Sequence, residues 1–432
     1  MSWDFLTEPE FQEQLDWMDE FVRAEIWPME AIAAELGTRL DEALEEPRRL
    51  VKERGMWAAH LPPELGGQGF GQVKLGLMHE ILGTSPLAPY AFGNQAPDSG
   101  NSEILASAGT AQQKADYLEP LLSGRLRSAF SMTEPDVAGS DPTVMLTTAS
   151  REGDEYVING HKWFTTNGSV ADFLIVMAVT DPRAAPHRRA SMFIVDANTD
   201  GVRMVRDVPT MEHPVETFGL LEGHSEIRYE GVRVSAESLL GGEGEGFEIA
   251  QRRLGPGRIH HCMRWLGVAR RAFEMLCERA TYRVSHGHPL GEHQTIQNFI
   301  AESAAEMQAA RLMTLHAAWK IDNEGASAAR REIAMIKYYG AQVLDDVVDR
   351  ALQAHGALGY STDLPLERMY RSARSARIYD GPDEVHRVSV AKHVLRGFGP
   401  PRNGIPSEHL PTRRAEARRR YADLLDPVAR GG

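Results

Sequence analysis

Cysteine is scarce in this chain of 432 residues, which contains only Cys262 and Cys277. Neither belongs to a C-x-x-C spacing, so the sequence predicts neither a disulfide framework nor a structural zinc site. Long apolar runs are also missing. The best of them, residues 173–179, is much shorter than the about 20 residues that cross a bilayer, and it is typical of a buried strand. We therefore expect no membrane span.

A basic N-terminal start is absent too, because residues 1–8 lead directly into an acidic helical pattern. Secretory and mitochondrial leaders begin with basic residues, so we expect a cytoplasmic protein. The formal net charge of −14 argues against nucleic acid as a partner, although a local basic site can still hold an anionic ligand. No metal is expected, because His286, His288 and His293 lack the i, i+4 pairing or a cysteine partner.

What the chain does have is enough length for two or three domains, with a change of periodicity between them. Residues 1–124 show helical spacing, and residues 125–242 alternate as strands do. Residues 243–398 contain long amphipathic helices, and a Pro/Arg-rich tail follows at 399–432. The sequence therefore predicts an α+β fold with an N-terminal helical domain, a middle antiparallel β domain, a C-terminal helix bundle and an appended tail.

Short polar segments punctuate these parts. Residues 152–154 (EGD) and 159–160 (NG) are turn signals inside the strand-rich part, and the second is the strongest short hairpin signal. Residues 242–246 (GEGEG) lack the spacing of a dinucleotide fingerprint, and their glutamates would repel a pyrophosphate. We interpret this last segment as the joint between two domains.

Three further segments carry chemical side chains. Residues 130–141 (FSMTEPDVAGSD) join a short apolar strand to a polar turn that can carry a flat aromatic cofactor. Residues 159–168 (NGHKWFTTNG) place two aromatic rings beside two threonines, and residues 379–387 (YDGPDEVHR) hold a carboxylate on a turn that opens a helix. In this order and spacing the segments resemble the acyl-CoA dehydrogenase family, over roughly residues 10 to 397.

The resemblance implies an oxidoreductase of fatty acid oxidation, which converts a fatty or branched acyl-CoA to its trans-2-enoyl-CoA. Such a reaction needs a base for the α-proton and an acceptor for the β-hydride, and N5 of FAD can be that acceptor. Asp380 stands where most of the family has a glutamate base. Asp380 could instead be only a helix N-cap. If an apolar acyl chain buries it, its pKa should rise.

The resemblance also implies where FAD binds. The implied FAD-binding residues are Phe130, Met132, Thr133, Ser140, Phe164, Thr166, Arg283, Gln294, Gln353, Gly356, Pro382 and Glu384. Arg283 matches a position that meets the pyrophosphate, and a guanidinium fork suits phosphate. Gln294 fits an ordinary helix-surface residue equally well. The turn that precedes Ser140 is one residue longer than usual in the family, so the ligand of Ser140 stays open. Since a neighbouring subunit supplies part of this site in the family, we expect a homo-oligomer, either a dimer or a tetramer.

Substrate contacts are implied for Ser140, Arg258, Tyr379 and Gly381. Arg258 lies in a basic island, residues 251–261, that would attract the phosphates of coenzyme A. Electrons would leave through an electron-transferring flavoprotein. Two alternatives remain. Aspartate at the position of Asp380 also occurs in nitroalkane oxidases, which reoxidise their flavin with oxygen, and a member could bind flavin without catalysis.

Overall fold

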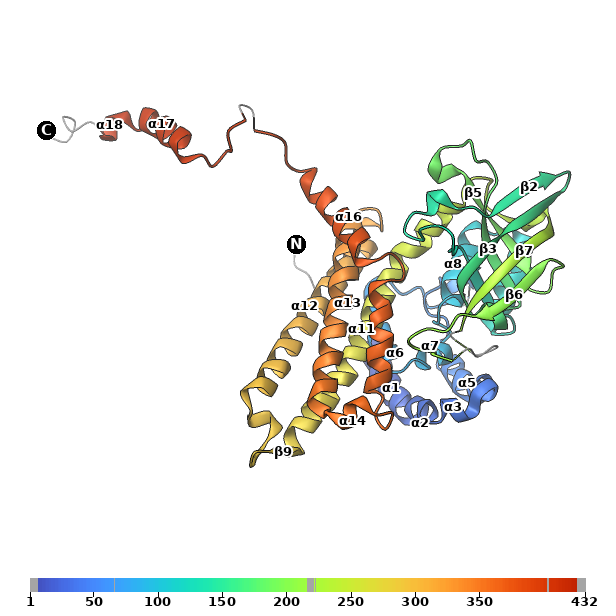
Figure 1. Cartoon of the computed structure of the whole chain (residues 1–432), viewed down its shortest axis with the longest axis horizontal. Coiled ribbons are helices and arrows are strands. Elements are labelled where there is room, and N and C mark those ends of the chain that lie inside the picture. Colours follow the sequence, from blue (N-terminus) through green and yellow to red (C-terminus); the bar gives the residue numbers. More distant parts are fainter. Residues whose placement is uncertain (1–6, 66, 216–220, 222, 402–403, 426–432) are drawn as a thin grey trace. The chain divides into compact units, whose positions relative to one another are not determined.

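The computed structural model describes residues 7–65, 67–215, 221, 223–401 and 404–425, and Figure 1 shows the whole chain. The chain divides into two compact units, residues 1–387 and 388–432. Residues 1–6, to which the expectation about a leader refers, lie outside the described residues, as does the end of the expected tail. All of the chemical segments discussed above lie in the first unit.

The N-terminal part is helical because its apolar residues recur at helical spacing. Phe11, Leu15 and Met18 share one face of its first helix and are buried, as their spacing predicts. The sixth helix is buried along most of its length because it packs against helices from both ends of the chain. The helices are α1 (Pro9–Phe21), α2 (Trp27–Ala31), α3 (Ala33–Leu36), α4 (Leu40–Ala43), α5 (Glu45–Glu53), α6 (Gln72–Leu82), α7 (Ala88–Ala91), α8 (Asp98–Ala108), α9 (Ala111–Gln113) and α10 (Glu119–Ser123).

An eight-stranded sheet follows, in the order β6-β7-β3-β2-β4-β5-β8, with β1 beside β4. Its strands are β1 (Ser128–Ser131), β2 (Thr148–Glu152), β3 (Glu155–Thr166), β4 (Phe173–Val179), β5 (Ala190–Asp196), β6 (Val202–Asp207), β7 (His224–Ser235) and β8 (Leu239–Leu240). The sheet is antiparallel as expected, except that β1 and the start of β2 pair with β4 in parallel. The apolar run 173–179 is the central strand β4, with apolar neighbours on both faces.

The two turn signals of the sheet have different outcomes. Gly153, at φ 65°, turns the chain between β2 and β3 as predicted. The prediction of a turn at residues 159–160 is wrong, because β3 runs straight through them with only a shift of register against β7. A Cβ atom on Gly160 would lie 2.2 Å from Oγ1 of Thr147. Glycine therefore permits close packing at this position and does not make a turn.

The C-terminal helices of the first unit form a bundle around α11, which packs against α12, α13 and α6 (Figure 1). The predicted apolar stripe of α13 is buried, from Ile333 to Ala351. The segment 242–245 lies between β8 and α11, where a joint was expected. The elements are α11 (Gly246–Tyr282), β9 (Val284–Ser285), β10 (His288–Pro289), α12 (Gln294–Glu324), α13 (Arg330–His355), α14 (Ala357–Tyr360), α15 (Leu366–Ala373) and α16 (Asp383–Leu395).

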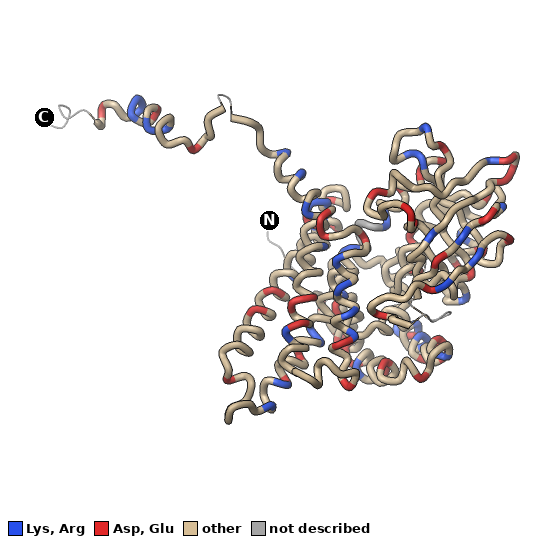
Figure 2. The backbone as a smooth tube through the Cα atoms, in the orientation of Figure 1, with Lys and Arg blue, Asp and Glu red and all other residues tan. Residues whose placement is uncertain are grey.

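The second unit begins within α16 and contains α17 (Leu410–Arg420) and α18 (Ala422–Leu425). Every side chain of α17 is exposed, and its arginines form the blue segment near the C-terminus in Figure 2. This exposure fits a solvated helix. No helix in the described part of the chain is both long and apolar enough to cross a membrane.

Candidate active site

The turn that carries Asp380 is held by its own main chain. Asp380 adopts φ 53°, a left-handed conformation that is uncommon for a residue other than glycine. Its carbonyl oxygen accepts hydrogen bonds from Nη2 of Arg258 at 3.1 Å and from Nε2 of His386 at 3.2 Å. Burial, followed by the charge of Arg258, lowers the pKa of His386 to about 4, so its ring is neutral at pH 7. Helices α11 and α16 thus fix one peptide from two sides.

The Asp380 carboxylate points toward α11. Its Oδ2 lies 3.2 Å from Nε2 of His261, and 23% of the side chain is exposed. Burial alone would raise the pKa of Asp380, but the hydrogen bond from His261 and the charges of Arg253 and Arg258 lower it well below the usual value. This lowered pKa belongs to the protein without substrate, so the expectation that an acyl chain over Asp380 raises its pKa stays a prediction. The carboxylate is ionised, as a base must be.

Asp380 does not cap the helix that follows it. Helix α16 begins at Asp383, three residues later. In the described residues the carboxylate has its hydrogen bond with His261 and none with a main-chain N–H of α16. The N-cap interpretation is therefore wrong, because the turn through Gly381, at φ 97°, separates Asp380 from the helix start.

Two residues that the sequence analysis did not single out support this turn from within the bundle. Lys337 is fully buried, and its ammonium donates to the carbonyl oxygens of Ala376 at 2.7 Å and Gly381 at 3.4 Å. Trp265 donates through Nε1 to the Tyr379 hydroxyl at 2.6 Å. A lysine beside the apolar stripe of α13 was the sequence signal that could have identified Lys337. The sequence contained no such signal for Trp265 or for His261.

The segment expected to carry the flavin is fixed by a buried ion pair. Lys162 on β3 donates to the carbonyl oxygen of Met132 at 2.8 Å and to Oε1 of Glu134 at 2.9 Å. Glu134 also accepts from the main-chain N–H groups of residues 146 and 147. Burial lowers the pKa of Lys162 to about 8, although Glu134 opposes the shift. The main chain of Thr133 is pinned as well, because its carbonyl accepts from Trp163 N at 3.0 Å.

The residues next to this segment fit a flat aromatic cofactor. Phe164 is 42% exposed at φ 49°, where the register of β3 against β7 shifts between Lys162 and Thr165. Its ring meets Trp163 edge-on at 4.9 Å. Thr166, two residues further on, presents a hydroxyl that contacts Nδ1 of His224 at 3.0 Å. An uncovered ring beside polar groups is what a stacked isoalloxazine requires. Ser140 is exposed nearby in sequence, at the end of its turn.

The basic island divides in two. Arg252 is exposed and pairs with Glu248 at 2.7 Å, as an ordinary helix-surface residue does. Arg253 instead places its guanidinium 5.2 Å from the centre of the Phe130 ring. A Cβ atom on Gly100 would lie 2.0 Å from Nε of Arg253, so a side chain at position 100 would displace this guanidinium. The side chains of residues 254–256 lie outside the described set.

The expected contacts to the dinucleotide tail lie elsewhere. Arg283, Gln294, Gln353 and Gly356 are all exposed. Arg283 directly follows the end of α11, roughly seven helical turns or about 37 Å from Arg258. The structure thus does not bring these residues together with Asp380 within one chain. Pro382 and Glu384, in contrast, are next to Asp380 at the start of α16.

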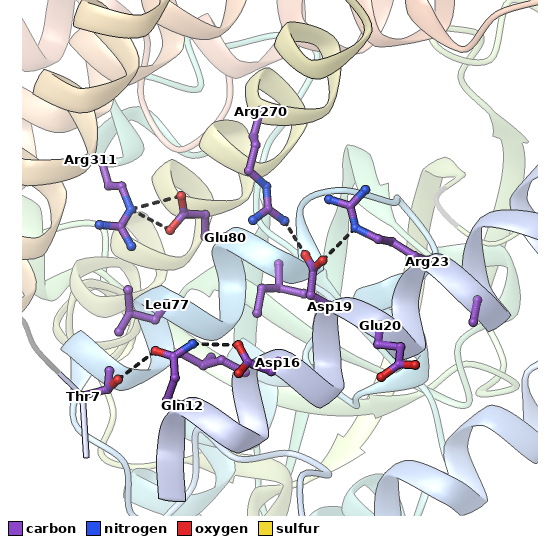
Figure 3. Close-up of a pocket in the computed structure, with 13 residues that line it drawn as sticks. Thr7, Gln12, Asp16, Asp19, Glu20, Arg23, Leu77, Glu80, Arg270 and Arg311 are labelled. Atoms are coloured by element: carbon purple, nitrogen blue, oxygen red, sulfur yellow. Dashed lines mark hydrogen bonds and ion pairs between the residues drawn. The ribbon is translucent and has the colours of Figure 1, made fainter. Parts of the chain in front are cut away.

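A further cleft lies away from the predicted site residues. It has a volume of about 900 Å³ and lies among α1, α6, α11 and α12 (Figure 3). Arg23 and Arg270 both contact Asp19 in it, at 2.7 and 2.8 Å, and Arg311 contacts Glu80 at 2.8 Å. None of the predicted site residues lines it. Its three arginines are already paired with carboxylates, so we assign it no role in the chemistry.

Comparison with known proteins follows the same three parts of the chain. Residues 8–125 match the N-terminal domain of acyl-CoA dehydrogenases, residues 129–217 the middle domain and residues 244–395 the C-terminal domain. The chain belongs to the acyl-CoA dehydrogenase family. It is therefore an oxidoreductase with the acyl-CoA dehydrogenase fold, as the motifs predicted.

Individual relatives agree with this assignment. The chain is 46% identical, over 397 residues, to the probable acyl-CoA dehydrogenase FadE2 of Mycobacterium tuberculosis, which covers 91% of this chain and 93% of that relative. A putative acyl-CoA dehydrogenase from Mycobacterium abscessus has a similar structure, with a TM-score of 0.86, 38% identity, and coverage of 91% and 100% of the two chains. An FAD complex of PigA matches at a TM-score of 0.80 with 25% identity over 91% of this chain and all of that one. The cofactor of this family member is FAD.

Proposed function

We propose that the enzyme uses Asp380 to take the α-proton of an acyl-CoA thioester and passes the β-hydride to FAD, which gives the trans-2-enoyl-CoA. The observation that carries this proposal is the ionised Asp380 carboxylate on a turn fixed by Arg258, Lys337 and His386. A base must be ionised and come within about 3 Å of the proton donor. Bound FAD supplies the hydride acceptor.

The low pKa of Asp380 fits this role once substrate binds. A carboxylate that is 23% exposed still contacts water, which stabilises its charge. An acyl chain that covers it removes that water, and desolvation raises the pKa of a carboxylate. The base therefore becomes stronger when its substrate is in place. Arg253, whose guanidinium lies over the Phe130 ring, contributes positive potential for the phosphates of coenzyme A. A direct contact of Arg258 with substrate remains a prediction, since this residue is held on the Asp380 carbonyl.

We infer that a second copy of the chain completes the cofactor site. Phe164 and Thr166 lie on β3, whereas Arg283 is exposed beyond the end of α11, about 37 Å along that helix from Arg258. Gln294, at the start of α12, and Gln353, near the end of α13, are exposed as well. Exposed polar residues such as these fit a cofactor bound by the neighbouring copy. A homotetramer, or at least a dimer, is accordingly part of the proposal.

The test is anaerobic titration of the purified protein with saturated acyl-CoAs of different chain length and branching. Bleaching of the flavin absorbance, together with a product two hydrogens lighter, supports the proposal. Reoxidation by an electron-transferring flavoprotein, faster than by oxygen, supports that acceptor. If no acyl-CoA bleaches the flavin, the proposed reaction is wrong.

A second candidate function follows from one observation, the aspartate at position 380. An oxidase of the nitroalkane type would use the same carboxylate to remove a proton from carbon. Oxygen consumption with nitroalkanes, and no bleaching by acyl-CoA, would favour it. Absence of both reactions in a protein with full flavin would favour a catalytically silent member.

A further inference from the structure

A row of buried and half-buried polar side chains runs from the Asp380 carboxylate into the N-terminal helices. His261 lies with Nε2 3.2 Å from Asp380 Oδ2, and its Nδ1 lies 3.0 Å from Nη2 of Arg264. The other terminal nitrogen of Arg264, Nη1, reaches Nδ1 of His79 on α6 at 3.2 Å. The proposed reaction assigns no task to these three residues, although the row begins at its base.

The partners of His261 fix the position of its proton. A guanidinium has N–H donors and no acceptor, and it stays charged in proteins. Nδ1 of His261 must therefore accept from Arg264 and carries no hydrogen. The ring hydrogen is then on Nε2, where it is donated to Asp380. Burial and the charge of Arg264 lower the pKa of His261, in spite of Asp380, so the ring is neutral.

We propose that His261 is a positioning residue, held in its Nε2–H form by Arg264, which fixes one oxygen of the Asp380 carboxylate and leaves the other for the substrate proton. The proposal rests on the proposed function of Asp380 as the base. Arg258 and His386 hold the Asp380 main chain but leave its side chain free to rotate. In the described part of the chain, Nε2 of His261, at 3.2 Å, is the one cationic or imidazole group in contact with the carboxylate.

Other charged groups also face Asp380, so they limit how much of its lowered pKa depends on His261. Arg253 and Arg258 approach from α11, Lys337 approaches from α13, and His386 on α16 is neutral at pH 7. These cations favour ionisation of Asp380 but do not contact its carboxylate. Loss of His261 is therefore expected to free the side chain and to raise the pKa of Asp380 in part, without returning the carboxyl to a neutral state at pH 7.

The experiment compares three single variants of the FAD-loaded protein. His261→Gln keeps an N–H donor near the position of Nε2, and His261→Leu removes it. Cys262→Ser is the matched control, because Cys262 is the next residue of α11, is fully buried, and points to the Ile336 carbonyl on α13. Infrared difference titration follows the carboxyl band of Asp380, which is identified by its loss in Asp380→Asn. Stopped-flow flavin reduction by acyl-CoA is measured across pH in the same proteins.

In the parent, Asp380 should stay ionised at acid pH, below the ordinary aspartate midpoint of about 3.9. In His261→Leu the midpoint should rise by about one unit or more, and the acid limb of flavin reduction should move with it. His261→Gln and Cys262→Ser should remain close to the parent. A parent midpoint at the ordinary value, or the same midpoint in His261→Leu as in the parent, would overturn the proposal.

Infrared titration and stopped-flow flavin reduction distinguish the positioning role of His261 from the proposed function of Asp380 as the base. Infrared titration needs no substrate, so it tests His261 even if no acyl-CoA reduces the flavin, a result that would contradict the proposed function instead. If His261→Leu does not fold, the midpoint of Asp380 in the parent and in His261→Gln still tests the positioning role. A rate that falls equally in the Gln and Leu variants, with an unmoved pH profile, would show that the ring only fills space and would reject the positioning role.

Discussion

Arg258 and Asp380 are joined through the main chain of the aspartate and not through its carboxylate. Nη2 and Nε of Arg258 lie 3.1 and 3.3 Å from the Asp380 carbonyl oxygen. A forked guanidinium is suited to this two-point contact, whereas an ammonium makes a point contact. The arginine therefore sets the direction of the peptide on which the carboxylate is mounted.

Arg258→Lys is accordingly expected to keep FAD but to slow flavin reduction by about 10- to 100-fold, or about 1.4 to 2.7 kcal/mol of barrier. The reason is that the Asp380 peptide loses one of its two arginine contacts. Arg252→Lys is the control, since Arg252 is exposed and, among the described residues, pairs only with Glu248 in α11. Single-turnover bleaching compares the two. Equal rates in both variants would show that the contact does not position the base.

Asp380→Asn is predicted to fold, retain FAD and bind acyl-CoA, because the amide keeps the size of the carboxylate. Flavin reduction should slow by several orders of magnitude, since an amide cannot take the α-proton. Stopped-flow absorbance under anaerobic conditions measures this step directly. A rate within about tenfold of the parent, only 1.4 kcal/mol of barrier, would mean that another group is the base.

Arg283→Ala should release FAD more readily and weaken the oligomer, because we place this exposed arginine on the pyrophosphate bound by the neighbouring copy. Arg233→Ala is a matched control on β7, where the arginine pairs with Glu152 and Glu155 on the surface. Light scattering and flavin content after gel filtration report both effects. Full flavin and an unchanged oligomer in the Arg283 variant would contradict the shared site.

Lys162→Met is expected to destabilise the sheet by about 3 kcal/mol and to loosen FAD, because it leaves Glu134 buried without its cation. The pKa of Lys162, about 8 in the folded chain, is below its ordinary value. Between about pH 8 and pH 10.4 the unfolded chain therefore binds a proton that the folded chain does not, so stability rises with pH there. The variant should lose this rise.

Thermal unfolding followed by flavin fluorescence at pH 7 and pH 9.5 measures both parts of the Lys162 prediction. Lys392→Met, at an exposed position of α16, is the control. Parent and Lys162→Met proteins with the same melting temperature at pH 7 would show that the ion pair is not what holds the flavin segment.

Glu103→Gln on α8 should stabilise the protein at pH 8 and have a smaller effect at pH 5. Burial raises the pKa of Glu103 to about 7, although Arg253 opposes the shift. Between the ordinary glutamate value of about 4.3 and pH 7 the folded chain binds the extra proton, so stability falls as pH rises. Removal of the charge should recover up to about 3.7 kcal/mol at pH 8, the free energy that corresponds to a pKa raised from about 4.3 to about 7.

Melting curves at pH 5 and pH 8 test this pH dependence, with the exposed Glu119→Gln as control. The difference between Glu103→Gln and the parent should grow from pH 5 to pH 8. A difference that is constant across this range would show that Glu103 titrates normally.

The sequence by itself determined the order of the parts and the family. The buried faces of α1 and α13 follow from apolar spacing. The turn between β2 and β3 follows from Gly153, which adopts a positive φ. Both are local properties, since spacing along a helix and the φ of one residue depend on neighbours in the chain. The motif at residues 379–387 likewise predicts Asp380 as the candidate base from its position in the sequence alone.

Only the tertiary structure decided what surrounds those residues. The Asn159-Gly160 pair carries a turn signal, yet the approach of Thr147 makes Gly160 part of a continuous strand. Burial alone predicts a raised pKa for Asp380, yet His261 and the arginines of α11 lower it. Close packing and Coulomb interactions depend on distances between residues far apart in the chain, and those distances are set when the helices and the sheet pack together.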